Sequence, residues 1–267
     1  MQSYSDKLPN LEANHYETDN DICQQLHSHY FLGTDKLASL ALPAKFDNYQ
    51  KTITEQVMHY VDKYEIPTNK CLDLGCSVGR TSFTLAQHFQ HVDAVDFSAR
   101  YIQHGVNLQQ GKSVRYQLQN EGEIVDFHEI SLANVDLPCS QNIQFSQGDL
   151  SNLKNNFIGY DLIIVQQVLE ESYNPSQFLQ SVHERMNKNA LLIVVSTYNF
   201  DEQNTEKSNW LGGRKINGEN VTGLDGLSLL LNKHFTFLAQ QDLTRAIQIN
   251  NRHFTLSFPH LSAWQLN

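Results

Sequence analysis

Lys70-Cys-Leu-Asp-Leu-Gly-Cys-Ser-Val-Gly-Arg-Thr-Ser-Phe-Thr-Leu85 is the segment that decides the fold of this chain. Its apolar start predicts a short buried strand that ends at Leu74, and residues 81–88 predict a helix. The small residues between them predict a tight turn whose backbone is open to a ligand, with the free N–H groups of the helix start facing it. Turns of this kind bind nucleotides in some proteins and merely pack tightly in others.

Length and charge limit the class of protein. With 267 residues the chain is long enough for one α/β domain with additions. The formal charge of −10 argues against a nucleic-acid partner, because such a partner requires a basic face. No apolar run is long enough to span a membrane, and the N-terminus lacks the apolar block of a secretory signal. The 4 cysteines lack zinc-like spacing, so we expect reduced thiols in a cytoplasmic protein and no metal site.

Strands and helices are expected to alternate after the opening segment. Predicted strands lie at residues 92–98, 143–145, 160–165 and 190–195, and predicted helices at 99–109 and 175–186. The apolar run at 160–165 is typical of a central parallel strand that is covered on both faces. A helix at 224–231 and two late strands, at 235–240 and 253–264, would complete the sheet. This order predicts an α/β fold, the Rossmann-like class I S-adenosylmethionine-dependent methyltransferase fold, with a seven-stranded, mostly parallel sheet and helices on both faces.

The chain divides into two expected parts. Helices predicted at 21–31 and 49–64 precede the sheet, so we expect residues 1–65 to form an N-terminal helical extension that contributes to the acceptor pocket. Residues 66–267 would form the methyltransferase core. Residues 111–142 are too long for an ordinary connection, and 197–222 form a polar loop, so we interpret both as insertions in the core.

Polar side chains follow four successive predicted strands. In an open α/β sheet, ligands bind beyond the carboxyl ends of the strands, so these side chains are expected to meet there. Asp96 would accept the ribose hydroxyls of a nucleoside, and Asp149 with the amide of Leu150 would hold the adenine edge. Asp73 would contact a methionine amino group, directly or through water. The expected cofactor-binding residues are Asp73, Gly75, Cys76, Ser77, Gly79, Asp96, Phe97, Asp149, Leu150 and Gln166.

The charges around this predicted site favour one cofactor. Three aspartates suit a cationic sulfonium with a free ammonium better than a diphosphate. No basic residue directly follows the second strand, where a 2′-phosphate would require one. The expected cofactor is therefore S-adenosyl-L-methionine, with S-adenosyl-L-homocysteine as the product, rather than NAD(P).

Several blocks of the chain resemble one particular family. They are Asn14-His-Tyr-Glu-Thr-Asp19, Leu26–Tyr30, Leu72–Arg80, Val95–Ser98, Glu121-Gly-Glu123, Gly148-Asp149 and Asn209-Trp-Leu-Gly-Gly213. Together they are similar to the 4-mercaptohistidine (5-thiohistidine) N1-methyltransferase family, the methyltransferase domain of ovothiol synthases, here as a stand-alone chain. The resemblance implies methylation of an imidazole ring nitrogen of 5-thiohistidine to give ovothiol A. Because the family domain is often fused behind a sulfoxide synthase, a separate sulfoxide synthase is a candidate functional partner.

The residues that would hold the acceptor remain a group without assigned roles. They are Tyr16, Glu17, Asp19, His29 and Tyr30, which could fix the tautomer of a neutral imidazole and leave one nitrogen bare. A capped helix with its polar face in water would explain the same residues without a site. The chain departs from the family at Ile247-Gln248-Ile249, where the family carries Ile-Arg-Glu. Two alternatives therefore remain: a methyltransferase for another small amino acid or imidazole, and a non-catalytic protein that binds S-adenosylmethionine.

Overall fold

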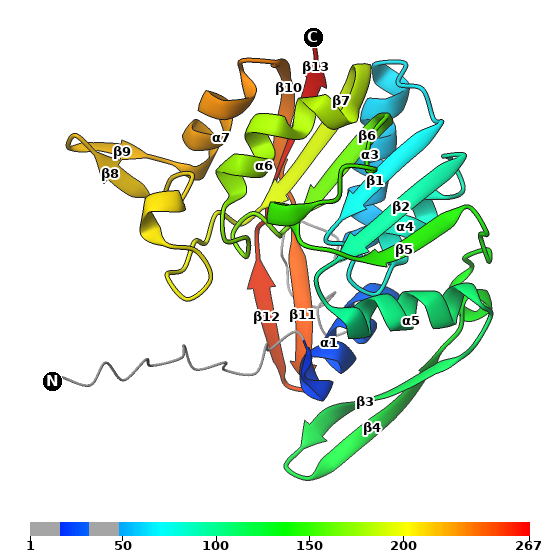
Figure 1. The fold of residues 1–267 in the computed structure, drawn as a ribbon. Helices are drawn as coiled ribbons and strands as arrows, with labels where there is room; N and C mark the ends of the chain where they lie inside the picture. Colours follow the sequence, from blue (N-terminus) through cyan, green and yellow to red (C-terminus); the bar gives the residue numbers. More distant parts are fainter. Residues whose placement is uncertain (1–16, 32–47) are drawn as a thin grey trace, which may run out of the picture.

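A seven-stranded sheet forms the centre of the molecule in a computed structural model, which describes residues 17–31 and 48–267 (Figure 1). The sheet order is β10-β13-β7-β6-β1-β2-β5, and within the sheet only β13 runs against its neighbours. Its strands are β1 (Lys70–Leu74), β2 (His91–Asp96), β5 (Ile143–Gln147), β6 (Tyr160–Gln166), β7 (Met186–Ser196), β10 (Phe235–Asp242) and β13 (His260–Leu266). This topology confirms the predicted class I methyltransferase fold.

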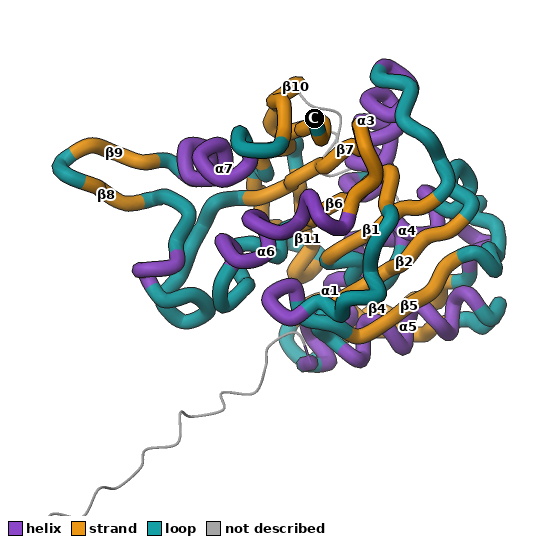
Figure 2. Tube along the Cα trace, turned by 45° about the horizontal axis from the view of Figure 1, so that its top comes forward, coloured by secondary structure: helices purple, strands orange, loops and turns teal. Residues whose placement is uncertain are grey.

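Helices cover both faces of the sheet (Figure 2). They are α1 (Asp19–Tyr30), α3 (Tyr49–Lys63), α4 (Arg80–Leu85), α5 (Ala99–Gln109), α6 (Pro175–Ser181) and α7 (Gly223–Leu231). In β6, Leu162 and Ile164 pack with residues of α3 and α4, whereas Ile163 and Val165 pack with residues of α6 and α7. Successive side chains of a strand point to opposite faces, so a strand that is apolar at every position requires a cover on each side.

The two segments expected to be insertions in the core each contain a hairpin, although 197–222 was expected to be a polar loop. Residues 111–142 contain a hairpin, β3 (Val114–Glu121) and β4 (Ile124–Ile130), and residues 197–222 contain a second hairpin, β8 (Arg214–Ile216) and β9 (Glu219–Val221). The β3–β4 hairpin packs against α1, where His27 Nδ1 lies 2.9 Å from the Tyr116 hydroxyl. Within the described ranges, no helix is long and apolar enough to cross a membrane.

The prediction of a single late strand at 253–264 is wrong. The structure divides it into β12 (His253–Ser257) and β13, and β12 pairs with an additional strand, β11 (Arg245–Asn250). Pro259 lies at the break; it has no N–H to donate to a ladder, and its carbonyl accepts the N–H of Leu243 at 2.8 Å. The β11–β12 hairpin thereby leaves the sheet and lies beside α1, near the ends of the parallel strands (Figure 1).

Candidate active site

A cavity of about 250 Å³ lies beyond the carboxyl ends of β1, β2 and β6. The strand ends supply one part of its wall, with Gly75, Ser77, Asp96, Phe97, Gln166 and Gln167. The opposite part comes from α1, α3 and β11, with Gln25, His29, Tyr49, Gln50 and Arg245. The cavity therefore joins the predicted cofactor side to the N-terminal helices and to a hairpin from near the end of the chain.

The glycines of the turn after β1 are required by backbone conformation and by close packing. Gly75 has a φ of 81°, and a Cβ there would lie 2.4 Å from the carbonyl oxygen of Gln166 and 2.6 Å from Val168 Cγ1. Gly79 has a φ of 91°, and a Cβ there would lie 2.8 Å from the ring of Phe145. Left-handed backbone disfavours any side chain. The turn is thus held tightly against the neighbouring strands, and Gly75 also lines the cavity.

Asp96 lies at the end of β2 and lines the cavity. Its two carboxylate oxygens accept the backbone N–H groups of Ser77 at 2.8 Å and of Ser98 at 2.9 Å. The pKa of this carboxyl group is raised to about 6, mainly by burial and to a smaller extent by the nearby Glu17 charge, against the lowering effect of the backbone N–H groups. At neutral pH Asp96 is therefore mostly ionised, and each oxygen keeps a lone pair for another donor.

Asp73 is buried beneath the cavity rather than in its wall. Its oxygens accept hydrogen bonds from the Ser82 hydroxyl at 2.6 Å and from the Gln166 amide at 2.5 Å. Burial raises its pKa to about 6 as well, against these two hydrogen bonds. Asp73 consequently fixes the orientation of Gln166, whose side chain belongs to the cavity wall.

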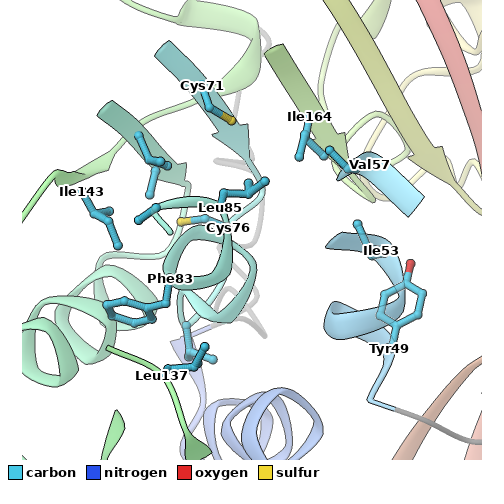
Figure 3. Close-up of a cluster of buried hydrophobic side chains, with 14 of the residues drawn as sticks. Tyr49, Ile53, Val57, Cys71, Cys76, Phe83, Leu85, Leu137, Ile143 and Ile164 are labelled. Carbon is cyan, nitrogen blue, oxygen red and sulfur yellow. The ribbon is translucent and has the colours of Figure 1, made fainter. Parts of the chain in front are cut away.

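The other predicted cofactor residues take different positions. Phe97 lines the cavity with 57% of its surface exposed. Asp149 caps a short 3-10 helix by accepting the N–H of Ser151 at 2.9 Å, and neither it nor Leu150 contributes to the cavity wall. Cys76 points into the hydrophobic cluster between the sheet and α4, where burial raises the pKa of its thiol (Figure 3).

His29 lines the cavity and is almost completely buried. Burial lowers the pKa of its imidazole well below the ordinary value, and the charges of Arg245 and Arg80 lower it further. Its Nδ1 atom has no hydrogen-bond partner in the described part of the chain. The structure thus places a neutral imidazole at the cavity, with an Nδ1 that has no partner among the described residues. Tyr16 lies outside the described residues.

The remaining predicted acceptor residues lie around α1 without lining the cavity. The buried Tyr30 hydroxyl donates to the carbonyl oxygen of Val78 at 2.7 Å. Asp19 is exposed and pairs with Arg100 at 2.6 Å, and the Glu17 carbonyl accepts from the same guanidinium at 2.6 Å. These contacts attach the start of α1 to α5.

Several cavity residues were not predicted from the sequence, among them Tyr49, Gln50, Glu170 and Arg245. The Tyr49 hydroxyl and Gln50 Oε1 are buried and, among the described residues, have no hydrogen-bond partner. Glu170 accepts the N–H and hydroxyl of Thr197 at 2.8 and 2.9 Å, and Arg245 comes from β11. The only sequence signal for Tyr49 was its place at the start of a predicted helix, and a local pattern does not reveal which long-range partner a helix end meets.

Comparison with known proteins identifies the family. Residues 46–251 match a family model described as a methyltransferase domain. The chain belongs to this methyltransferase family. Curated protein sequences give no match.

Solved structures agree with this methyltransferase fold. A S-adenosylmethionine-dependent methyltransferase from Methanosarcina mazei is 16% identical, with 78% of this chain and 96% of that chain covered and a TM-score of 0.51. The N-methyltransferase NodS from Bradyrhizobium japonicum is 13% identical, with 82% and 96% covered and a TM-score of 0.51. A S-adenosylmethionine-dependent methyltransferase from Clostridium acetobutylicum is 14% identical, with 87% and 96% covered and a TM-score of 0.51. At these identities the similarity supports the fold.

The cofactor of this methyltransferase is S-adenosylmethionine, which supplies an electrophilic methyl group on a sulfonium. The residues at the strand ends fit such a molecule. Asp96 retains acceptor capacity for hydroxyl groups, and the exposed ring of Phe97 provides a flat apolar surface. The Ser77 hydroxyl is buried and has no partner among the described residues, so a polar ligand in the cavity would satisfy it.

Proposed function

We propose that this methyltransferase methylates an imidazole ring nitrogen of 5-thiohistidine and so produces ovothiol A. The observation that carries the proposal is a group of buried polar atoms on the acceptor side of the cavity. His29 Nδ1, the Tyr49 hydroxyl and Gln50 Oε1 have no hydrogen-bond partner in the described ranges. A buried polar atom without a partner costs about 1–3 kcal/mol, so this side of the cavity suits a small acceptor that is itself polar. The sequence resemblance supports 5-thiohistidine among such acceptors.

The cofactor side has a proposed role for each of its polar residues. Asp96 would accept the two ribose hydroxyls, and Phe97 would contact the face of the base. Gln166, oriented by Asp73, would face the methionine ammonium, whereas Asp149 and Leu150 lie outside the cavity wall and are assigned no contact with the cofactor. Asp73 and Asp96 have a pKa of about 6, so both are mostly ionised at neutral pH and place negative charge near a cationic ligand.

Positioning is the main contribution that the acceptor side would make. Methyl transfer is an in-line displacement, and alignment of the reacting atoms can account for roughly 7–11 kcal/mol of a barrier. His29 is neutral, so in the tautomer with its proton on Nε2 its unpartnered Nδ1 would accept the N–H of the acceptor ring and leave the lone pair of the opposite nitrogen free. Burial raises the pKa of the Tyr49 hydroxyl, which therefore remains a donor. Together these groups would select one tautomer and hold the more nucleophilic sulfur away from the methyl carbon.

The N-terminal extension, residues 1–65, would form part of the acceptor pocket under this proposal. Its support is that Gln25, His29, Tyr49 and Gln50 all reach the cavity from α1 and α3. The thiol of the acceptor would be introduced earlier by a separate enzyme, and a sulfoxide synthase is the candidate functional partner.

Transfer of a labelled methyl group from S-adenosylmethionine tests the acceptor. With 5-thiohistidine as acceptor we expect turnover, and NMR of the product should show the methyl group on a ring nitrogen. Histidine lacks the thiol and should be a much poorer acceptor, because groups placed for a polar substituent would be left unpaired. Equal turnover of histidine and 5-thiohistidine, or methylation of sulfur, would refute the proposed acceptor. Turnover of another imidazole or amino acid alone would favour the broader alternative.

A further inference from the structure

Arg245 brings a positive charge to the acceptor side of the cavity without an acidic partner. Its Nη1 donates to Gln167 Oε1 at 2.7 Å, and its Nη2 lies 3.5 Å from Gln25 Oε1. Its Nε is buried and has no hydrogen-bond partner, and the guanidinium makes no ion pair with any described residue. Its two hydrogen-bond acceptors are neutral amides.

Among the described residues, the groups around this guanidinium make no ion pair with it. His29 is neutral, and the charge of Arg245 is one cause of its lowered pKa. The ring centroid of Tyr49 lies 5.6 Å from the guanidinium carbon. Glu170 lines the same cavity and its charge also acts on the Tyr49 hydroxyl, but its carboxylate is held by three hydrogen bonds from Ser196 and Thr197 and makes no ion pair with Arg245. A partly buried cation is costly unless an anion or several acceptors approach it, so the cavity is suited to an anionic ligand group at this position.

We infer that Arg245 binds the carboxylate of the methyl acceptor, so that the substrate class is small molecules that carry a carboxylate beside the methylated nitrogen. This inference rests on the proposed function and adds the residue that selects its substrate. A guanidinium binds a carboxylate through two parallel N–H groups, and the unpartnered Nε of Arg245 can supply one of the two.

Gln167 provides the rigid support that such a role requires. It follows β6 with a φ of 50°, and its N–H donates to the carbonyl oxygen of Val195 at 2.7 Å. Its side chain thereby holds Arg245 of the β11–β12 hairpin at the end of the central sheet. The guanidinium is oriented from the same strand end that bears Gln166 on the cofactor side, so a bound carboxylate would have a defined position relative to the methyl donor.

Matched pairs of acceptors with and without a carboxylate test the inference. The first pair is 5-thiohistidine and 5-thiohistamine, and the second is histidine and histamine. We expect the wild-type enzyme to prefer the acid of a pair at least 100-fold in kcat/KM for transfer of labelled methyl. Arg245→Met should lower kcat/KM for the acid about 100-fold, mainly through KM, and leave the amine unchanged, and Arg245→Lys should retain an intermediate preference. Arg252→Met is the control, because Arg252 is exposed near the tip of the same hairpin and pairs with Glu121.

The outcomes separate this inference from the proposed acceptor. Equal use of both members of a pair by the wild-type enzyme, or an acid preference that persists in Arg245→Met, would overturn the role of Arg245. An acid preference confined to the histidine pair would refute 5-thiohistidine as the acceptor and leave Arg245 in place. If neither acid is turned over and neither binds in calorimetry, the role of Arg245 and the proposed acceptor are both refuted. Titration with S-adenosylhomocysteine checks that Arg245→Met is folded, and if it is not, the wild-type and Arg245→Lys preferences decide.

Discussion

Replacement of Gly75 with alanine would place a methyl group against the end of β6. The new Cβ would lie 2.4 Å from the carbonyl oxygen of Gln166 and 2.6 Å from Val168 Cγ1, and the residue would also keep a φ of 81°. The left-handed conformation costs about 1–2 kcal/mol for a residue with a side chain, and overpacking against the backbone costs about 1–3 kcal/mol more. We therefore expect Gly75→Ala to lower the free energy of unfolding by about 2–5 kcal/mol.

Gly111 offers a matched control for this substitution. Its φ is 76°, and a Cβ there would meet nothing within 4 Å, so Gly111→Ala should incur only the conformational cost of about 1–2 kcal/mol. Urea unfolding followed by tryptophan fluorescence measures both variants, with the buried Trp264 as a probe. Calorimetric titration should also show weaker cofactor binding for Gly75→Ala, because the clash displaces Gln166 of the cavity wall, and unchanged binding for Gly111→Ala. Equal destabilisation of the two variants would refute the argument from close packing.

Further predictions concern Asp96, His29 and the absence of a metal requirement. Asp96→Asn should weaken S-adenosylmethionine binding at least tenfold at pH 7.5, because hydrogen bonds to a charged group contribute about 1.5–3 kcal/mol each. Calorimetry across pH should show wild-type affinity falling below about pH 6, where the carboxylate binds a proton, and a flatter profile in Asp96→Asn. His29→Phe should lower methyl transfer at least tenfold with cofactor binding retained, whereas His59→Phe, on the exposed face of α3, should match the wild type. Below about pH 6.5 His29 binds a proton in the unfolded chain but not in the folded chain, so the wild-type protein loses stability as the pH is lowered. This loss should be smaller in His29→Phe. Equal slopes of unfolding free energy against pH, measured by urea titration, would contradict this. A chelator should leave activity unchanged, and loss of activity that a divalent ion restores would refute a metal-free reaction.

Local patterns predicted the elements of the sheet and its surrounding helices. The apolar run at 160–165 corresponds to β6, and the helix expected at 99–109 has the bounds of α5. Such elements depend on the alternation of side chains along a strand and on capping at helix ends, which neighbouring residues largely determine. The late segment 253–264 was misread because its apolar content continues through the proline that ends one strand and precedes the next.

The sequence by itself determined the strands and helices of the class I fold, the tight turn after β1 and the position of Asp96 at a strand end, because each depends on residues close together in the chain. Only the tertiary structure decided the acceptor side of the cavity. His29, Tyr49 and Arg245 come from α1, α3 and β11, and they meet because the β11–β12 hairpin leaves the sheet and packs against α1. It also decided which predicted residues face away, since Cys76 and Tyr30 belong to the buried hydrophobic core. Convergence of this kind depends on contacts between distant segments, and no local pattern of polar and apolar residues encodes it.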